Sequence, residues 1–173
     1  MILLIAALPA AGQKLADIDV FKGSVGIWTG KGKSVLGPEK KQVGVTDLWK
    51  GQLVDDGKVY IQDGKITLSE GGSFGYRWVY RYEEGQLIAR YADSTNNGGI
   101  CAVELSKDKK TMTLSPLNMD LEAEKRGLFS TVALKDGAYR YTAELRGADG
   151  TVNVKTEMTC RPRVEEPEKD LEK

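Results

Sequence analysis

The sequence predicts an all-β fold of about ten antiparallel strands that follow one another as a meander. From Ser24 onward, apolar and polar side chains alternate with the period of two that half-buried strands show. Turn-forming pairs such as Asp63-Gly64 and Asp136-Gly137 recur at intervals of about ten residues. Asp-Gly and Asn-Gly readily adopt the positive φ angles of tight hairpins, so these pairs indicate hairpin turns. A meander of this kind is typical of β-sandwiches and of up-and-down β-barrels.

The strand boundaries follow from the turns and the alternation. A short N-terminal helix is expected before the strands, because Leu15, Ile18 and Phe21 recur at helical spacing. One interior segment, 118–127, is a second helical candidate that ends at Gly127. We predict strands over 24–35, 41–53, 58–62, 65–70, 74–83, 86–93, 99–106, 110–115, 127–135, 138–146 and 151–161.

The chain divides into three parts. Residues 1–12 are apolar and uncharged, and their length matches the apolar region of a signal peptide; a membrane span needs about 20 such residues. Ala10-Ala11-Gly12 supplies the small residues that signal peptidase accepts. We therefore expect a signal peptide remnant over 1–12 and a secreted or periplasmic protein without an integral membrane span; a short buried helix is the alternative. Residues 13–163 are expected to form a single domain, and 164–173 a charged flexible tail.

Composition excludes several classes of function. The chain of 173 residues carries 25 basic and 25 acidic residues and no histidine. The balanced charge argues against nucleic-acid binding, which depends on a surplus of Lys and Arg. Without histidine, Ser-His-Asp and Cys-His catalysis, most catalytic zinc sites and haem held by an imidazole are excluded. We expect no enzyme, no cofactor and no metal; the remaining catalytic route pairs Asp47 or Asp93 with a tyrosine as acid and base.

The segment 74–93 carries an aromatic stripe. A two-residue turn at Glu84-Gly85 places Trp78 opposite Tyr91 on the same face of the hairpin. The stripe is either packed core or the wall of a pocket, because Tyr and Trp provide apolar surface with polar atoms at its edge. The residues that alternate onto this face of the first strand are Phe74, Tyr76, Trp78, Tyr80 and Tyr82.

The opposite face of the same hairpin carries Arg77, Arg81 and Arg90. Because Val79 and Ile88 lie on this face too, a mixed, solvated outer surface is the favoured interpretation. A shift of one residue would invert the hairpin, and the arginines would then line the interior and favour an acidic ligand.

Cys101 and Cys160 are the only cysteines, and the alternation points both of them inward. In an exported protein two cysteines usually form a disulfide, and this one would close a loop of about 60 residues and contribute roughly 4 kcal/mol. Two buried free thiols are the alternative. Their spacing fits no zinc motif, which requires ligands in pairs.

A short motif at the first predicted strand resembles the signature of a known superfamily. Gly26-x-Trp28 follows the short helix and precedes the meander, as the Gly-x-Trp signature does in lipocalins and related calycin barrels. The resemblance implies a closed, lipocalin-like barrel, in which the Trp closes the base and an Arg from a late strand packs over it. Arg161 or Arg163 would take that part. No Thr-Asp-Tyr motif is found, and three predicted strands follow 118–127, so the resemblance is to a superfamily relative of the lipocalins.

The resemblance and the aromatic stripe together suggest a binding protein. The expected function is an exported barrel that holds a small hydrophobic or amphipathic ligand. The alternative is a structural or interaction protein of the cell envelope, whose barrel interior is solid core and binds no ligand. The expected ligand-binding residues are Trp28, Tyr76, Trp78, Tyr80, Tyr91, Tyr139 and Tyr141.

Overall fold

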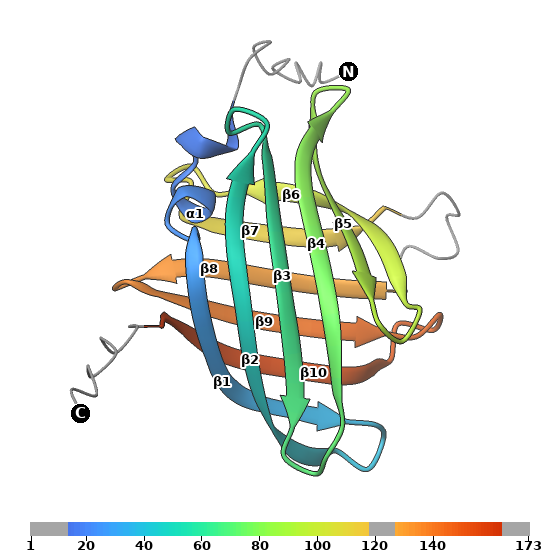
Figure 1. Ribbon diagram of the computed structural model, residues 1–173. Coiled ribbons are helices and arrows are strands. Elements are labelled where there is room, and N and C mark those ends of the chain that lie inside the picture. Colours follow the sequence, from blue (N-terminus) through green and yellow to red (C-terminus); the bar gives the residue numbers. More distant parts are fainter. Residues whose placement is uncertain (1–13, 118–126, 164–173) are drawn as a thin grey trace, which may run out of the picture.

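The computed structural model describes residues 14–117 and 127–163, and its strands form one closed antiparallel barrel (Figure 1). Neighbours in sequence pair with each other all the way round, and β1 pairs with β10 to close the barrel. The ten strands are β1 (Gly26–Leu36), β2 (Lys41–Val54), β3 (Val59–Leu68), β4 (Ser73–Glu83), β5 (Gln86–Asp93), β6 (Gly98–Leu105), β7 (Thr111–Pro116), β8 (Gly127–Lys135), β9 (Ala138–Arg146) and β10 (Val152–Pro162).

The predicted all-β, up-and-down barrel is confirmed, and most strand boundaries lie within two residues of the prediction. The register of the aromatic hairpin is confirmed as well: Trp78 pairs with Tyr91, and Tyr80 pairs with Ala89. Glu84 and Gly85 have the positive φ angles of 49° and 84° that such a tight turn requires.

One predicted turn is wrong. Asp63-Gly64 does not separate two strands, because both residues lie inside the continuous strand β3. Gly64 pairs with Tyr76 of β4, whose ring lies so close that a side chain at position 64 would collide with it. The glycine is therefore needed because an aromatic ring lies close to the backbone. In the sequence, such a glycine after an Asp looks the same as a turn.

A short helical segment closes one end of the barrel (Figure 1). It consists of the 3₁₀ turn η1 (Leu15–Asp17) and the α-helix α1 (Asp19–Lys22), as the spacing of apolar residues predicts. Three backbone and side-chain contacts tie it to the barrel: Ala16 N–H donates to Gly57 O, Val20 N–H donates to Lys109 O, and Tyr139 Oη donates to Val20 O. We call this segment the plug.

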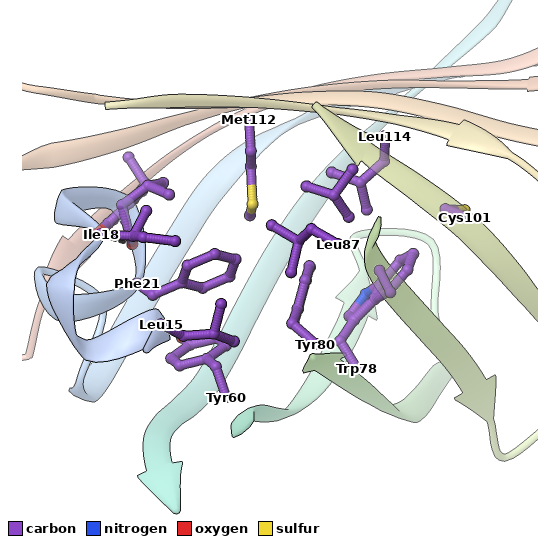
Figure 2. Packing of buried hydrophobic residues seen from close by; sticks show 14 of the residues in the cluster. Leu15, Ile18, Phe21, Tyr60, Trp78, Tyr80, Leu87, Cys101, Met112 and Leu114 are labelled. Atoms are coloured by element: carbon purple, nitrogen blue, oxygen red, sulfur yellow. Dashed lines mark hydrogen bonds between the residues drawn. The ribbon is translucent and has the colours of Figure 1, made fainter. Parts of the chain in front are cut away.

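Apolar side chains fix the plug in place. Leu15, Ile18 and Phe21 are fully buried. The Phe21 ring points into the barrel, where its centroid lies 5.3 Å from that of Tyr60 and 5.2 Å from that of Tyr80 (Figure 2). These edge-on and tilted contacts are the favourable geometries for aromatic pairs.

Three predictions fall on other parts of the chain. The expected signal peptide remnant at 1–12, the expected tail at 164–173 and residues 118–126 of the helical candidate lie outside the described residues. Gly127, the expected end of that helix, is the first residue of β8. Among the residues that the structure describes, no helix is long and apolar enough to cross a membrane.

Candidate functional site

The barrel interior has two halves that differ in how completely protein atoms fill them. The plugged half lies beneath the plug, at the end where β1 begins. The open half lies toward the opposite end, where β1, β3 and β9 end at Leu36, Leu68 and Arg146. The described residues place no secondary-structure element across that second end.

The plugged half is solid aromatic core. Trp28 stacks on Trp49 with ring centroids 5.4 Å apart and planes 7° from parallel, and Tyr139 meets Trp28 edge-on at 4.8 Å. Tyr60 and Tyr80 complete the layer beneath Phe21 (Figure 2). All of these side chains are buried.

The predicted contact between a late arginine and Trp28 is wrong. Arg161 and Arg163 are both exposed, and Arg161 pairs with Thr29, whose side chain faces outward. The ring that stacks on Trp28 is that of Trp49. Within residues 14–117 and 127–163, the cation–π contact that forms is instead Arg146 over the Phe129 ring, at 4.3 Å.

The open half combines a small buried cluster of Val43, Val45 and Met158 with side chains that protein atoms cover only in part. Phe74, Tyr91 and Tyr141 alternate inward but remain partly exposed, and Leu145 is 44% exposed. Burial raises the pKa of Tyr141 above its usual range.

A buried carboxylate lies between the two halves. The alternation of β2 turns Val43, Val45, Asp47 and Trp49 inward, and Asp47 is 4% exposed. Tyr76 of β4 reaches across Gly64 of β3 and donates a hydrogen bond from its hydroxyl to Oδ2 of Asp47 at 2.8 Å. Oδ1 of Asp47 is buried and has no hydrogen-bond partner.

A third residue extends this contact into a chain of hydrogen bonds. Gln62 of β3 donates from Nε2 to the Tyr76 hydroxyl at 3.0 Å. The Tyr76 hydroxyl has a single proton, so it accepts from Gln62 and donates to Asp47. We call Gln62, Tyr76 and Asp47 the polar relay.

The electrostatics of Asp47 are those of a lone buried acid. Burial raises its pKa to about 6, and the hydrogen bond from Tyr76 offsets part of that rise. Buried polar groups normally have partners, so the orphaned Oδ1 is an acceptor position that the fold itself leaves unfilled. Ser130 of β8 is a second buried polar residue whose Oγ has no partner.

The carboxylate of the other predicted acid, Asp93, is hydrogen-bonded by residues close to it in the chain. Its carboxylate accepts hydrogen bonds from Tyr91 Oη, from the backbone and side chain of Thr95, and from the backbone and side chain of Asn97. Burial acts to raise its pKa, but these hydrogen bonds outweigh it and hold the pKa well below the usual range. Asp93 is therefore a structural residue of the β5–β6 turn.

The predicted disulfide is wrong: Cys101 and Cys160 are both buried free thiols. Both point inward as expected, but β6 and β10 have β7, β8 and β9 between them. Neighbouring strands lie about 4.8 Å apart, whereas a disulfide requires Cα atoms within about 7 Å. Burial raises the pKa of each thiol to about 11, so both are protonated at neutral pH.

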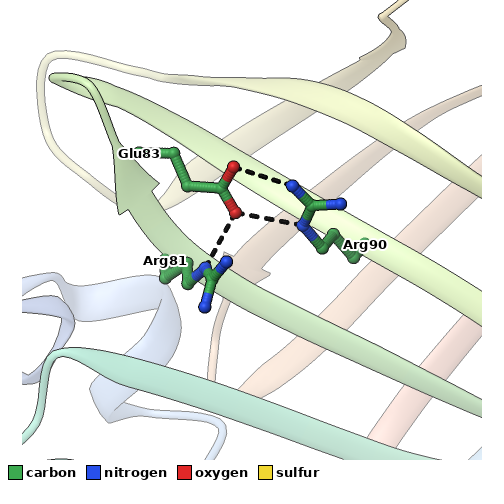
Figure 3. Close-up of polar contacts among 3 residues, drawn as sticks. All are labelled: Arg81, Glu83 and Arg90. Carbon is green, nitrogen blue, oxygen red and sulfur yellow. Dashed lines mark hydrogen bonds and ion pairs between the residues drawn. The ribbon is translucent and has the colours of Figure 1, made fainter.

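The three arginines of the aromatic hairpin lie on the outer surface, as predicted. Arg81 and Arg90 both bind the carboxylate of Glu83, at 2.7 and 2.8 Å (Figure 3). Hydrogen bonds from Arg90 and Arg81 lower the pKa of Glu83 to about 2. Arg77 pairs with Asp63 at 2.6 Å, so the inverted arrangement with arginines inside the barrel is excluded.

The structure gathers the expected ligand-binding residues inside the barrel but divides them between its halves. Trp28 and Tyr139 belong to the solid plugged half, and Tyr91 and Tyr141 line the open half. Tyr76 and Trp78 are buried between them, and Tyr80 lies in the plugged half beneath Phe21. In the part of the chain that the structure describes, no group of three or more His, Cys, Asp or Glu residues could hold a metal ion.

Comparisons with known proteins do not identify a function for this site. No protein-family model matches the chain, and no curated protein sequence matches it. Among solved structures, the chain is similar to a protein of unknown function from the DUF3598 family of Nostoc punctiforme. That match has 7% sequence identity and a TM-score of 0.29, and it covers 84% of this chain and 98% of the other.

Proposed function

We propose that the protein is a small-molecule-binding barrel of the calycin type, whose amphipathic ligand occupies the open half. The observation that carries this proposal is the partial covering of inward-facing side chains there, among them Phe74, Tyr91 and Tyr141. In a barrel whose interior were all core, these side chains would be as completely buried as Tyr60 and Tyr80.

The chemistry of the open half suits such a ligand. Small-molecule sites combine apolar and aromatic walls with a few polar groups that fix the ligand's orientation. Here the walls are aromatic rings, and the polar groups without partners are Oδ1 of Asp47 and Oγ of Ser130. The buried Trp28 beyond Gly26, which has a φ of 115°, further supports the calycin resemblance.

Binding accounts for these groups better than catalysis does. Asp47 beside Tyr76 is the acid–tyrosine pair that a histidine-free enzyme would need. However, burial raises the pKa of Tyr76, Cys101 and Cys160, so these groups keep their protons and are poor bases and nucleophiles. We therefore propose a binding protein, exported if residues 1–12 act as a signal peptide.

Titration with N-phenyl-1-naphthylamine, a neutral fluorescent probe, tests the function. We expect saturable binding with enhanced probe fluorescence and quenching of the tryptophans. Tyr141→Ala should weaken binding by about fivefold or more, because it removes part of the aromatic wall. The matched control is Arg140→Ala, which changes the exposed neighbour on the outer face and should leave the affinity unchanged.

Two results would count against this function. Absence of saturable binding by a folded wild-type protein would favour the structural alternative, in which the interior holds no ligand. Equal losses of affinity in Tyr141→Ala and Arg140→Ala would place the probe outside the barrel. Thermal unfolding of each variant shows whether it is folded.

A further inference from the structure

The charges inside the barrel are all of one sign. Asp47 is the one ionisable acid or base among the buried polar residues that the structure describes, which otherwise are serines. Every described Lys and Arg lies on the outside or at a turn, either exposed or, for Lys14 and Arg146, paired with an acid there. An interior with a carboxylate and no cation attracts positive charge and repels negative charge.

The polar relay determines which oxygen of Asp47 lacks a partner. Because Gln62 donates to Tyr76 and Tyr76 donates to Oδ2, that oxygen already has a partner. Oδ1 of the ionised carboxylate can only accept hydrogen bonds, and the hydrogen bond from Tyr76 to Oδ2 fixes its orientation. A preorganised acceptor of this kind binds a donor without losing side-chain entropy.

Two glycines adjoin this carboxylate, and neighbouring atoms pack closely against both. Gly30 pairs with Asp47 on one side and with Cys160 on the other, and a Cβ there would lie 3.2 Å from Asp47 Cβ and 2.9 Å from Cys160 Sγ. Gly64 lies under the Tyr76 ring. The wall of the barrel next to Asp47 therefore lacks side chains that could supply the missing donor.

Two tyrosines lie near the Asp47 carboxylate, and one of them, Tyr76, donates its hydroxyl proton to Oδ2. Tyr141 lies near enough for the Asp47 carboxylate to contribute to the rise in its pKa, after burial. The faces of tyrosine rings attract cations, most strongly where water is excluded. A carboxylate next to tyrosine rings is thus a site for a positive group attached to an apolar body.

We propose that the ligand of the open half carries a protonated amine, which binds Oδ1 of Asp47 while its apolar part lies against the tyrosines. This inference rests on the proposed function and names the chemical class of its ligand. It explains why the fold keeps an acid in a place where an apolar residue would pack without cost.

Three probes of equal chain length test the proposal: 1-octylamine, 1-octanol and octanoate, each below its micelle concentration. Binding to the whole protein is followed by tryptophan fluorescence at pH 7.5. We expect octylamine to bind roughly tenfold more tightly than octanol, and octanoate to bind most weakly, because a buried charge pair favours the matching sign.

Two variants locate the effect. Asp47→Asn keeps the shape of the side chain and removes its charge, and we expect octylamine and octanol to bind it equally well. Asp63→Asn is the matched control, because Asp63 is an acid on the outer face of the neighbouring strand β3. The preference for the amine should persist in that variant.

The possible outcomes separate the two proposals. If octanol and octanoate bind as tightly as octylamine, the amine inference is wrong and the binding function stands. If the preference for octylamine survives in Asp47→Asn, the amine binds elsewhere and the inference is wrong. If none of the three probes binds, the binding function fails, and the inference fails with it.

Discussion

The two halves of the barrel interior are both lined by aromatic side chains, but they differ in how completely these side chains are buried. In the plugged half, Trp28, Trp49 and Tyr139 pack ring against ring, and the Tyr139 hydroxyl is satisfied by the plug. In the open half, Tyr91 and Tyr141 point inward with part of their surface uncovered. The aromatic stripe thus specifies the inner face of the barrel, and the plug completes the burial of the rings beneath it.

The largest loss of stability is expected from a substitution in the plugged half. Phe21→Ala should lower the free energy of unfolding by about 3–5 kcal/mol, because a fully buried ring leaves a cavity against Tyr60 and Tyr80. Leu145→Ala in the open half should cost less than about 1 kcal/mol, because that side chain is already 44% exposed. Urea unfolding measures both. Similar losses in the two variants would contradict the division into halves.

A smaller loss is expected at the boundary between the halves. Gly64→Ala should cost about 1–3 kcal/mol, because the added methyl group displaces the Tyr76 ring and separates it from Asp47. Gly75→Ala on the adjacent strand is the control, since a Cβ there would meet only Gly64 O at 3.7 Å. Thermal unfolding compares the two. A Gly75→Ala variant as unstable as Gly64→Ala would mean that strand glycines matter for reasons other than Tyr76.

The third prediction concerns the charge of Asp47. Its pKa is about 6 in the folded protein and near 3.8 when unfolded, so the folded state holds the proton more tightly. The stabilisation present below pH 4 is therefore lost as pH rises through 6, and about 3 kcal/mol separates the two limits.

Asp47→Asn removes this dependence. We expect the variant to be more stable than the wild type at pH 8, by about 1–3 kcal/mol, and to lose the fall in stability between pH 4 and 7. Urea unfolding across this range measures it. An unchanged pH slope in the variant would show that Asp47 titrates normally and does not carry a buried charge.

Most of the fold could be predicted because it depends on short-range patterns. The turn at Glu84-Gly85 and the alternation on either side determine the register of β4 and β5, including the pairing of Trp78 with Tyr91. The same alternation in β2 turns Asp47 inward beside Val45 and Trp49, a signal that was available from sequence. What alternation lacks is the identity of the partner across the barrel.

The wrong predictions share that cause. Alternation gave the direction of Cys101 and Cys160 but not their positions around the barrel, which keep them apart. The motif around Trp28 suggested an arginine partner, whereas the ring that stacks on it is Trp49 from the adjacent strand. Asp63-Gly64 looked like a turn in the sequence. The residue that requires a glycine at position 64 is Tyr76, which comes from another strand.

The seam between β1 and β10 has a consequence for how the barrel folds. Every other pair of neighbouring strands is consecutive in sequence, whereas the seam joins Trp28 to Pro162 and Leu36 to Val154. Closing it brings together nearly the whole length of the domain, so it carries the largest loop-closure entropy of any pairing in the molecule. The local hairpins can form early, but the barrel becomes a single cooperative unit only when its first and last strands meet.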